Sequence, residues 1–128
     1  MTRFLLDTNA FIRILAGALP PRTERRVFRS GVELLLSIAT PWEIAIKRSL
    51  WQAGLTSELV EMKIAELGLR LLPITLEHTS ALHRLPSHHN EPFDRIIITQ
   101  ALVERCPVIS SDQRFPLYAN AGLKVVWD

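Results

Sequence analysis

The sequence predicts a three-layer α/β/α fold built around a mostly parallel sheet of about five strands. Two observations support this prediction. Short apolar runs alternate along the chain with segments of helical periodicity, as expected when each strand is followed by a crossover helix. The first apolar runs are also unbroken, which is typical of parallel strands buried on both faces. At 128 residues, 48% of them hydrophobic, the chain has the usual size of one domain. We therefore expect residues 1–128 to form a single domain.

Composition narrows the class of protein further. The formal net charge of +2 permits a nucleic-acid partner without requiring one. Cys106 is the only cysteine, which excludes an internal disulfide and suits a reducing compartment. No apolar run approaches the roughly 18 residues of a membrane span, and a strand pattern begins almost at the first residue. We expect a cytoplasmic protein with no membrane association.

The first strand is expected at residues 4–6, where three apolar residues run directly into Asp7. A short helix from residue 10 to 16 should follow and end at Gly17. The next helical segment is basic. Its arginines recur at spacings of three and four, which places them on one helix face: Arg22, Arg25, Arg26 and Arg29. A solvated face and a phosphate-binding stripe both explain these arginines, and the sequence leaves the two interpretations open.

A second strand at residues 34–38 leads into a helix with strong start signals. Thr40 suits the N-cap, Pro41 the first helical position and Glu43 the reciprocal position of a capping box. Glu43 also precedes Lys47 by one turn, so an ion pair on the helix surface is a second structural explanation for it. We expect this helix to continue through residue 51.

Strands and helices continue to alternate along the rest of the chain. We expect a helix at 57–67, a strand at 69–74 that Pro73 makes short or places at an edge, and a helix at 76–85 capped by Thr75. A buried helix should begin at Pro92 with Asp94 in its first turn, where the helix dipole favours an anion. Two final strands are expected, at 108–109 and 123–127.

The loop before residue 92 contains two adjacent histidines, His88 and His89. Adjacent histidines seldom bind the same ion, so we do not infer a metal site from them. A position near substrate or solvent is the preferred interpretation.

Four carboxylates occupy equivalent positions along this pattern. Asp7 follows the first strand and Asp112 follows the fourth, while Glu43 and Asp94 lie in the first turns of helices. The carboxyl ends of parallel strands and the starts of the following helices lie at one edge of a sheet. Each acid alone has a structural explanation as a cap or a dipole partner. Gathered at one edge they would repel one another unless a cation neutralised them. Oxygen ligands without organised His or Cys partners favour Mg²⁺ or Mn²⁺, ions that suit phosphodiester hydrolysis.

Four ordered blocks of sequence identify a resemblance. They are L-L-D-T-N at residue 5, A-T-P-W-E-I-A-I-K at 39, H-H-N-E-P-F-D-R with I-I-I-T-Q-A from 88, and V-I-S-S-D at 108. Together they resemble the PIN-domain ribonucleases, most closely the VapC-like toxins of bacterial toxin–antitoxin pairs. The resemblance covers almost the whole chain.

The resemblance implies a PIN-like fold and a Mg²⁺- or Mn²⁺-dependent endoribonuclease, the toxin component of its pair. A metal-activated water would cut RNA and leave a 5′-phosphate and a 3′-hydroxyl. By position, the catalytic and metal-binding acids are Asp7, Glu43, Asp94 and Asp112. Asn9 matches a polar position that supports the first acid and helps to position the substrate. The family often has another acid shortly after the fourth, but Gln113 and Arg114 stand here, so we expect four carboxylates. An antitoxin partner and a homodimer are also implied.

Two other functions share features with this sequence. The D-T-N triplet superficially resembles the start of haloacid dehalogenases, but that chemistry needs an aspartate where Asn9 stands. A catalytically inactive RNA- or antitoxin-binding module of the same fold is the main alternative. A module that only binds has no need of a repulsive carboxylate cluster, which favours the enzyme.

Overall fold

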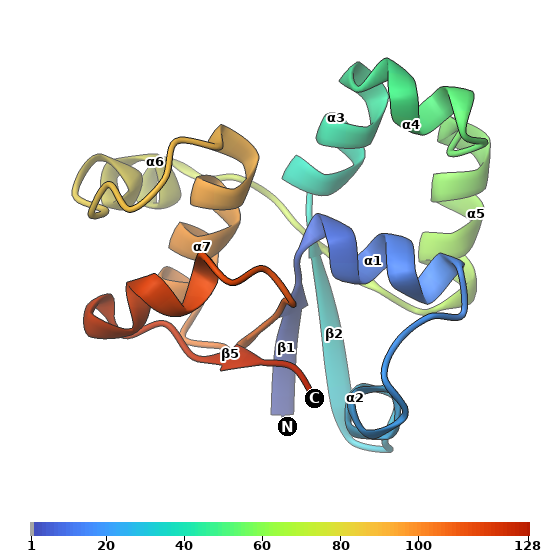
Figure 1. The fold of residues 1–128 in the computed structure, drawn as a ribbon, viewed down its shortest axis with the longest axis horizontal. Helices are drawn as coiled ribbons and strands as arrows, with labels where there is room; N and C mark the ends of the chain where they lie inside the picture. The colour runs from blue at the N-terminus through green and yellow to red at the C-terminus, as the bar shows by residue number, and fades with distance from the viewer. Residues whose placement is uncertain (1) are drawn as a thin grey trace.

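The structure is a computed structural model that describes residues 2–128, and its centre is a five-stranded sheet with helices on both faces (Figure 1). Every strand pairs in parallel with its neighbours, in the order β3-β2-β1-β4-β5. The strands are β1 (Thr2–Leu6), β2 (Val32–Ser37), β3 (Arg70–Leu72), β4 (Val108–Ile109) and β5 (Val125–Val126). The predicted fold class and the strand at each predicted place are confirmed.

Helices connect these strands. They are α1 (Thr8–Leu15), α2 (Pro21–Val27), α3 (Ala39–Ile46), α4 (Arg48–Gln52), α5 (Ser57–Glu66), α6 (Leu76–His83) and α7 (Pro92–Glu104). A 3-10 helix, η1 (Phe115–Ala121), lies between β4 and β5 and was not predicted. Within residues 2–128 no helix is long and apolar enough to cross a membrane.

The two central strands separate two apolar clusters. Leu5 of β1 and its register partner Leu35 of β2 face the cluster formed with α7 and η1. The neighbouring residues Phe4, Leu6 and Leu36 face the opposite cluster, formed with α1, α3 and α5. Because consecutive side chains enter different cores, both strands read as unbroken apolar runs in the sequence.

The predicted start and length of the helix after β2 were wrong. The helix begins at Ala39 after Ile38, whose side chain makes no cap hydrogen bond, so Thr40 is not an N-cap and makes no capping box with Glu43. The hydroxyl of Thr40 instead shares a hydrogen bond of 3.0 Å with the hydroxyl of Thr8. The helix also breaks at Lys47, whose extended backbone (φ −88°, ψ 97°) separates α3 from α4. The local sequence pattern predicted that the Thr40 hydroxyl caps the helix, but a tertiary contact with Thr8 of α1 takes that hydroxyl's hydrogen bond instead.

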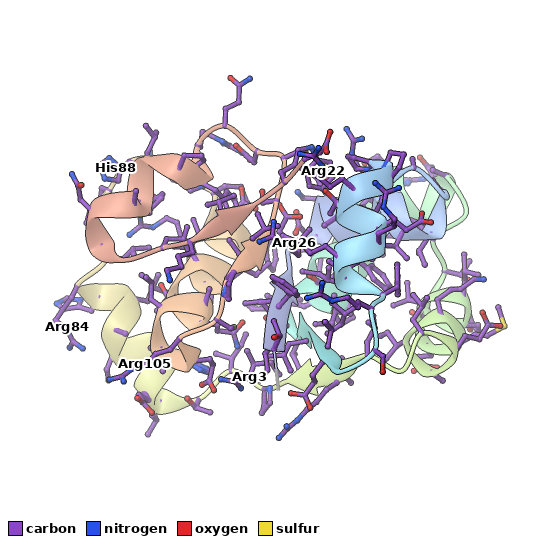
Figure 2. All side chains as sticks on the ribbon, turned by 90° about the horizontal axis from the view of Figure 1, so that it is seen from below. Arg3, Arg22, Arg26, Arg84, His88 and Arg105 are labelled. Carbon is purple, nitrogen blue, oxygen red and sulfur yellow. The ribbon has the colours of Figure 1, made fainter. Side chains whose placement is uncertain are left out.

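The basic segment forms a shorter helix than its periodicity predicted. α2 ends at Val27, so Arg29 lies beyond the helix and does not extend its face. Figure 1 places α2 beside the start of β2, whereas α3 follows the end of that strand. Figure 2 views the molecule from this lower side and shows Arg3, Arg22 and Arg26 there. The helix α2, with Arg22 and Arg26, therefore lies towards the lower side of the molecule, beside the start of β2.

Candidate functional site

The sheet order reverses between β1 and β4, since β2 and β3 extend it on one side of β1 and β4 and β5 on the other. Open α/β sheets bind their ligands at such a reversal, outside the carboxyl ends of the strands. Asp7 follows β1 directly, and Asp112 stands three residues after β4. Glu43 lies on α3 and Asp94 in the first turn of α7. The topology thus directs all four predicted acids to one edge.

Asp7 is buried at the start of α1, with 1% of its surface exposed. It is the N-cap of that helix, and its Oδ1 accepts a hydrogen bond of 2.7 Å from the Ala10 N–H. Burial raises the pKa of Asp7 to about 6, although hydrogen bonds from Ser110 and Ala10 partly offset this and the charges of Asp112 and Glu43 add to it. A capping role alone does not require a carboxylate to be this strongly desolvated.

Glu43 is also buried, with 6% of its surface exposed. Its Oε2 accepts a hydrogen bond from the Lys47 ammonium one turn later, which confirms the predicted ion pair. Its other oxygen, Oε1, is buried and has no hydrogen-bond partner within the described part of the chain. An unpartnered buried carboxylate oxygen costs free energy unless a ligand compensates it, so Oε1 is a candidate ligand atom.

Asp94 is not needed as a cap for α7. That role belongs to Glu91, whose Oε2 accepts a hydrogen bond of 2.7 Å from the Asp94 N–H. The pKa of Asp94 is raised to about 7, first by burial and then by the negative charges of Glu91, Asp112, Asp7 and Glu43. The four predicted acids are therefore close enough to repel one another.

Arg114 neutralises part of this charge. Its Nε and Nη2 donate to the two oxygens of Asp112 at 3.0 and 2.6 Å, and Nη2 also lies 3.2 Å from Oδ2 of Asp94. The hydrogen bonds from Arg114 hold the pKa of Asp112 below its usual range. Arg114 thus bridges the carboxylates of α7 and of the segment after β4.

The donor set suits a hard divalent cation. Across residues 2–128, no three Asp, Glu, His or Cys side chains are grouped closely enough to hold one metal ion, and Lys47 and Arg114 supply the positive charge instead. However, four carboxylates share one edge, two of them have raised pKa values, and Glu43 presents an unpartnered oxygen. These are the oxygen ligands that Mg²⁺ and Mn²⁺ prefer. The ligand atoms present are therefore of the type that suits such an ion, although within residues 2–128 they are not gathered around one point.

Two contacts fix the elements that carry the acids. The rings of Trp42 and Phe93, which precede Glu43 and Asp94, meet edge to face with centroids 5.0 Å apart. The Thr8–Thr40 hydrogen bond joins α1 to α3 on the other side. Because such pairs restrain the helix starts, the carboxylates are held by the fold rather than by flexible loops.

Asn9 is exposed on α1, and the groups that hold Asp7 are Ala10 and Ser110. The predicted role of Asn9 in positioning the substrate stays a prediction.

His88 stacks edge to face on Tyr118, while His89 lies beside the acids, with Nε2 3.5 Å from Oδ2 of Asp94. Burial, followed by the charge of Arg114, lowers the pKa of His89.

Sequence reasoning missed three groups at this edge. Glu91 could have been recognised as an N-cap, because Pro92 after it occupies the first helical position. Ser110, whose hydroxyl accepts from the Asp112 N–H at 3.1 Å, and Arg114 gave no local signal. Their contacts to the acids depend on the packing of β1, β4 and α7.

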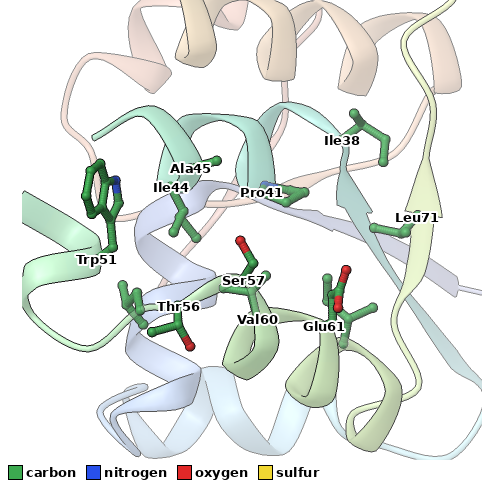
Figure 3. A pocket seen from close by; sticks show the side chains of 12 residues that line it. Ile38, Pro41, Ile44, Ala45, Trp51, Thr56, Ser57, Val60, Glu61 and Leu71 are labelled. Atoms are coloured by element: carbon green, nitrogen blue, oxygen red, sulfur yellow. The ribbon is translucent and has the colours of Figure 1, made fainter. Parts of the chain in front are cut away.

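An apolar groove of about 590 Å³ lies between α3 and α5 (Figure 3). Its walls include Ile38, Ile44, Trp51, Val60 and Leu71, and none of the four acids lines it. Ile38, Trp51 and Leu71 are exposed although they are apolar. The groove is therefore a second surface feature, separate from the carboxylates.

Comparison with known proteins agrees with this architecture. Structures with the same fold include a chain of VapBC2 from Rickettsia felis bound to a promoter DNA fragment (13% identity, TM-score 0.73, covering 99% of this chain and 100% of that one). VapBC-1 from nontypeable Haemophilus influenzae (16%, TM-score 0.74, 98% and 97%) is another. VapBC-5 from Mycobacterium tuberculosis, a member of the VapBC family of toxin–antitoxin systems, matches at 21% identity and TM-score 0.63 over 100% of both chains. No curated protein sequence matches significantly.

The sequence also matches the PIN domain over residues 4–121, which includes all four acids. This match and the parallel sheet with its acid-bearing edge confirm the predicted resemblance. The chain belongs to the PIN domain family.

Proposed function

We propose that this protein is a Mg²⁺- or Mn²⁺-dependent endoribonuclease and the toxin of a toxin–antitoxin pair. The observation that carries the proposal is the gathering of Asp7, Glu43, Asp94 and Asp112 at one edge of the sheet, with the pKa values of Asp7 and Asp94 raised to about 6 and about 7. Strongly perturbed carboxylates that act on one another mark functional sites more often than structural ones. The PIN domain match supports the same interpretation.

Each carboxylate has a distinct place in this proposal. Asp7 and Asp94 would hold the cation directly, and Glu43 and Asp112 would hold ions or their waters. A bound Mg²⁺ or Mn²⁺ supplies positive charge that polarises the phosphoryl oxygens and makes water more acidic. Asp7 is fixed by its cap hydrogen bond from Ala10 and by a hydrogen bond from Ser110. Glu43 offers its unpartnered Oε1.

In this proposal Arg114 would receive the RNA backbone. It is half exposed and lies at the rim of the acids, bonded to Asp94 and Asp112. Once a divalent cation neutralises those carboxylates, the guanidinium can contact a phosphate, which matches its planar donor geometry.

An antitoxin partner is part of the proposal. Its support is that similar solved structures include VapBC proteins, one of them described as a member of a family of toxin–antitoxin systems, and that the groove between α3 and α5 exposes apolar residues to a protein partner. A homodimer is proposed from the family resemblance alone. Sedimentation of the purified chain, with and without the product of the neighbouring reading frame, tests both.

The catalytic claim is tested by incubating the purified protein with total cellular RNA and Mn²⁺, with and without a chelator. We expect cleavage that the chelator abolishes. Asp7→Asn should fold normally, because Asn keeps the shape and a cap acceptor, but it should not cut RNA. Asp128→Asn is the matched control, since the one ion pair of Asp128 within residues 2–128 is with the exposed Arg22, at 4.0 Å.

Wild-type rates in Asp7→Asn, with unchanged metal dependence, would show that Asp7 does not hold the ion. RNA that is bound but never cut, by wild type and variants alike, would favour the inactive binding module.

A further inference from the structure

A buried series of hydrogen-bonded polar side chains leads from α7 to the candidate site. Nη1 of Arg95 donates a hydrogen bond of 3.1 Å to the hydroxyl of Tyr118, which is fully buried. That hydroxyl shares a hydrogen bond of 2.8 Å with Nδ1 of His89. The imidazole ring has 6% of its side chain exposed, and its other nitrogen, Nε2, lies 3.5 Å from Oδ2 of Asp94. Three side chains therefore connect in sequence to one of the predicted ligands.

The guanidinium of Arg95, which begins this series of hydrogen bonds, is held by several acceptors. Besides Tyr118, Arg95 donates hydrogen bonds to three backbone carbonyls, those of Leu85 at 3.2 Å, Pro86 at 2.8 Å and His89 at 3.3 Å. The same residue thus fixes both the loop that carries His89 and the hydroxyl that His89 contacts.

The hydrogen bonds around Tyr118 favour one tautomer of His89. Arginine only donates, so the Tyr118 oxygen accepts from Arg95, and its single hydrogen is free to be donated to Nδ1. A Tyr118 hydroxyl that donates to Nδ1 leaves the proton of the neutral ring on Nε2. The opposite tautomer would turn an unprotonated Nε2 towards Oδ2 of Asp94, with lone pairs opposed whenever that carboxylate is ionised. Nε2 is buried and makes no hydrogen bond to any residue from 2 to 128, so it is aimed at Asp94 without being satisfied there.

We propose that His89 is a positioning residue for Asp94, which it orients through its Nε2–H. The inference rests on the proposed function, in which Asp94 holds a divalent cation. Both contacts to that carboxylate, from Arg114 and from His89, are to Oδ2. Holding Oδ2 presents Oδ1 to the cation, and the contact with His89 remains when Arg114 turns away towards a phosphate. A donor that faces a ligand at 3.5 Å before loading can shorten its hydrogen bond when the site closes.

The first experiment measures the tautomer in metal-free protein. The two imidazole nitrogens of His89 are observed by long-range proton–nitrogen NMR on uniformly ¹⁵N-labelled protein. We expect the proton on Nε2 in the wild type and a mixture of tautomers in Tyr118→Phe, which loses the hydroxyl donor. A wild-type proton on Nδ1, or an unchanged spectrum in Tyr118→Phe, overturns the proposal.

The second experiment separates orientation from packing with two substitutions of His89. In His89→Gln the amide nitrogen reaches the position of Nε2 and can still donate to Asp94, whereas in His89→Asn it reaches only the position of Nδ1. Calorimetric titration with MnCl₂ should give His89→Asn an affinity about tenfold weaker than the wild type, the usual loss when a ligand's hydrogen-bond partner is removed. His89→Gln should restore most of it. His83→Asn, at an exposed position on α6, is the matched control.

The two experiments distinguish this inference from the proposed function. If the wild type binds manganese and both His89 variants bind it equally well, His89 does not orient Asp94, although the metal site stands. If the wild type binds no manganese, the proposed function fails, and the NMR result still decides whether the chain of hydrogen bonds sets the tautomer. Equal weakening in both variants would show that the ring only fills space.

Discussion

Replacing Asp94 with Asn should stabilise the metal-free protein while it abolishes RNA cleavage. The folded protein raises the pKa of Asp94 from 3.8 to about 7, so the ionised form is less stable in the native state than in the unfolded chain. For an acid whose pKa is raised, stability falls as the pH rises above the unfolded value, and the loss is complete above the folded value. At about 1.4 kcal/mol per pH unit, the cost reaches about 4 kcal/mol near pH 8 and falls below about 2 kcal/mol near pH 5.

The Asp94→Asn substitution would remove this cost and lose about 1 kcal/mol from the helix dipole and the exposed Arg114. We therefore expect the metal-free variant to be more stable than wild type by about 3 kcal/mol near pH 8, which corresponds to roughly 12 °C in melting temperature. The gain should shrink towards zero near pH 5. Manganese should stabilise the wild type by about 2.7 kcal/mol at a concentration of roughly 100 times its Kd, and the variant much less.

Thermal melts of both proteins with a chelator, at the two pH values, and then with manganese measure these differences. Asp128→Asn, which alters an exposed carboxylate paired only at 4.0 Å with Arg22 among residues 2–128, should melt like the wild type throughout. If Asp94 served only the helix dipole, its replacement would cost about 0.3–1 kcal/mol whatever the metal. A lower melting temperature for metal-free Asp94→Asn, with equal shifts of both proteins by manganese, would refute the repulsive cluster.

Other substitutions test neighbouring parts of the site. Glu43→Gln should lose cleavage in the RNA assay while keeping its fold, and normal cleavage would assign Glu43 to its ion pair with Lys47. Arg114→Gln should lower the melting temperature of the metal-free protein by an amount equivalent to about 1 kcal/mol but tighten manganese binding, since no guanidinium then competes for the carboxylates; weaker manganese binding would contradict that role. Reversing the charges of Arg22 and Arg26 should leave the salt dependence of RNA binding unchanged, because α2 lies at the opposite edge of the sheet. A flatter salt dependence would show that bound RNA reaches this helix.

The strands and the acid positions could be predicted because their signals are local. Residues 4–6 enter two cores in alternation, and this leaves an unbroken apolar run that ends at Asp7. Parallel topology then places strand ends and helix starts at one edge, so Glu43, Asp94 and Asp112 follow from their positions in the chain. The edge position of β3 could be predicted from Pro73, because proline has no N–H to donate to a neighbouring strand.

The remaining details depend on contacts between distant segments. Thr40 has the sequence context of a cap, yet its hydroxyl forms a hydrogen bond with the hydroxyl of Thr8. The break at Lys47 and the helix η1 have no periodic pattern of their own. The hydrogen bonds that link Arg95, Tyr118 and His89 cross from α7 to η1 and the preceding loop, and only the folded chain brings them together.

The most direct test of the divalent-cation site is a calorimetric titration of metal-free protein with MnCl₂. We expect saturable binding by the wild type, the same affinity in Asp128→Asn, and at least about a tenfold loss in Asp7→Asn. Equal affinities in the wild type and Asp7→Asn, or no binding by the wild type, would contradict the claim that these carboxylates form a metal site.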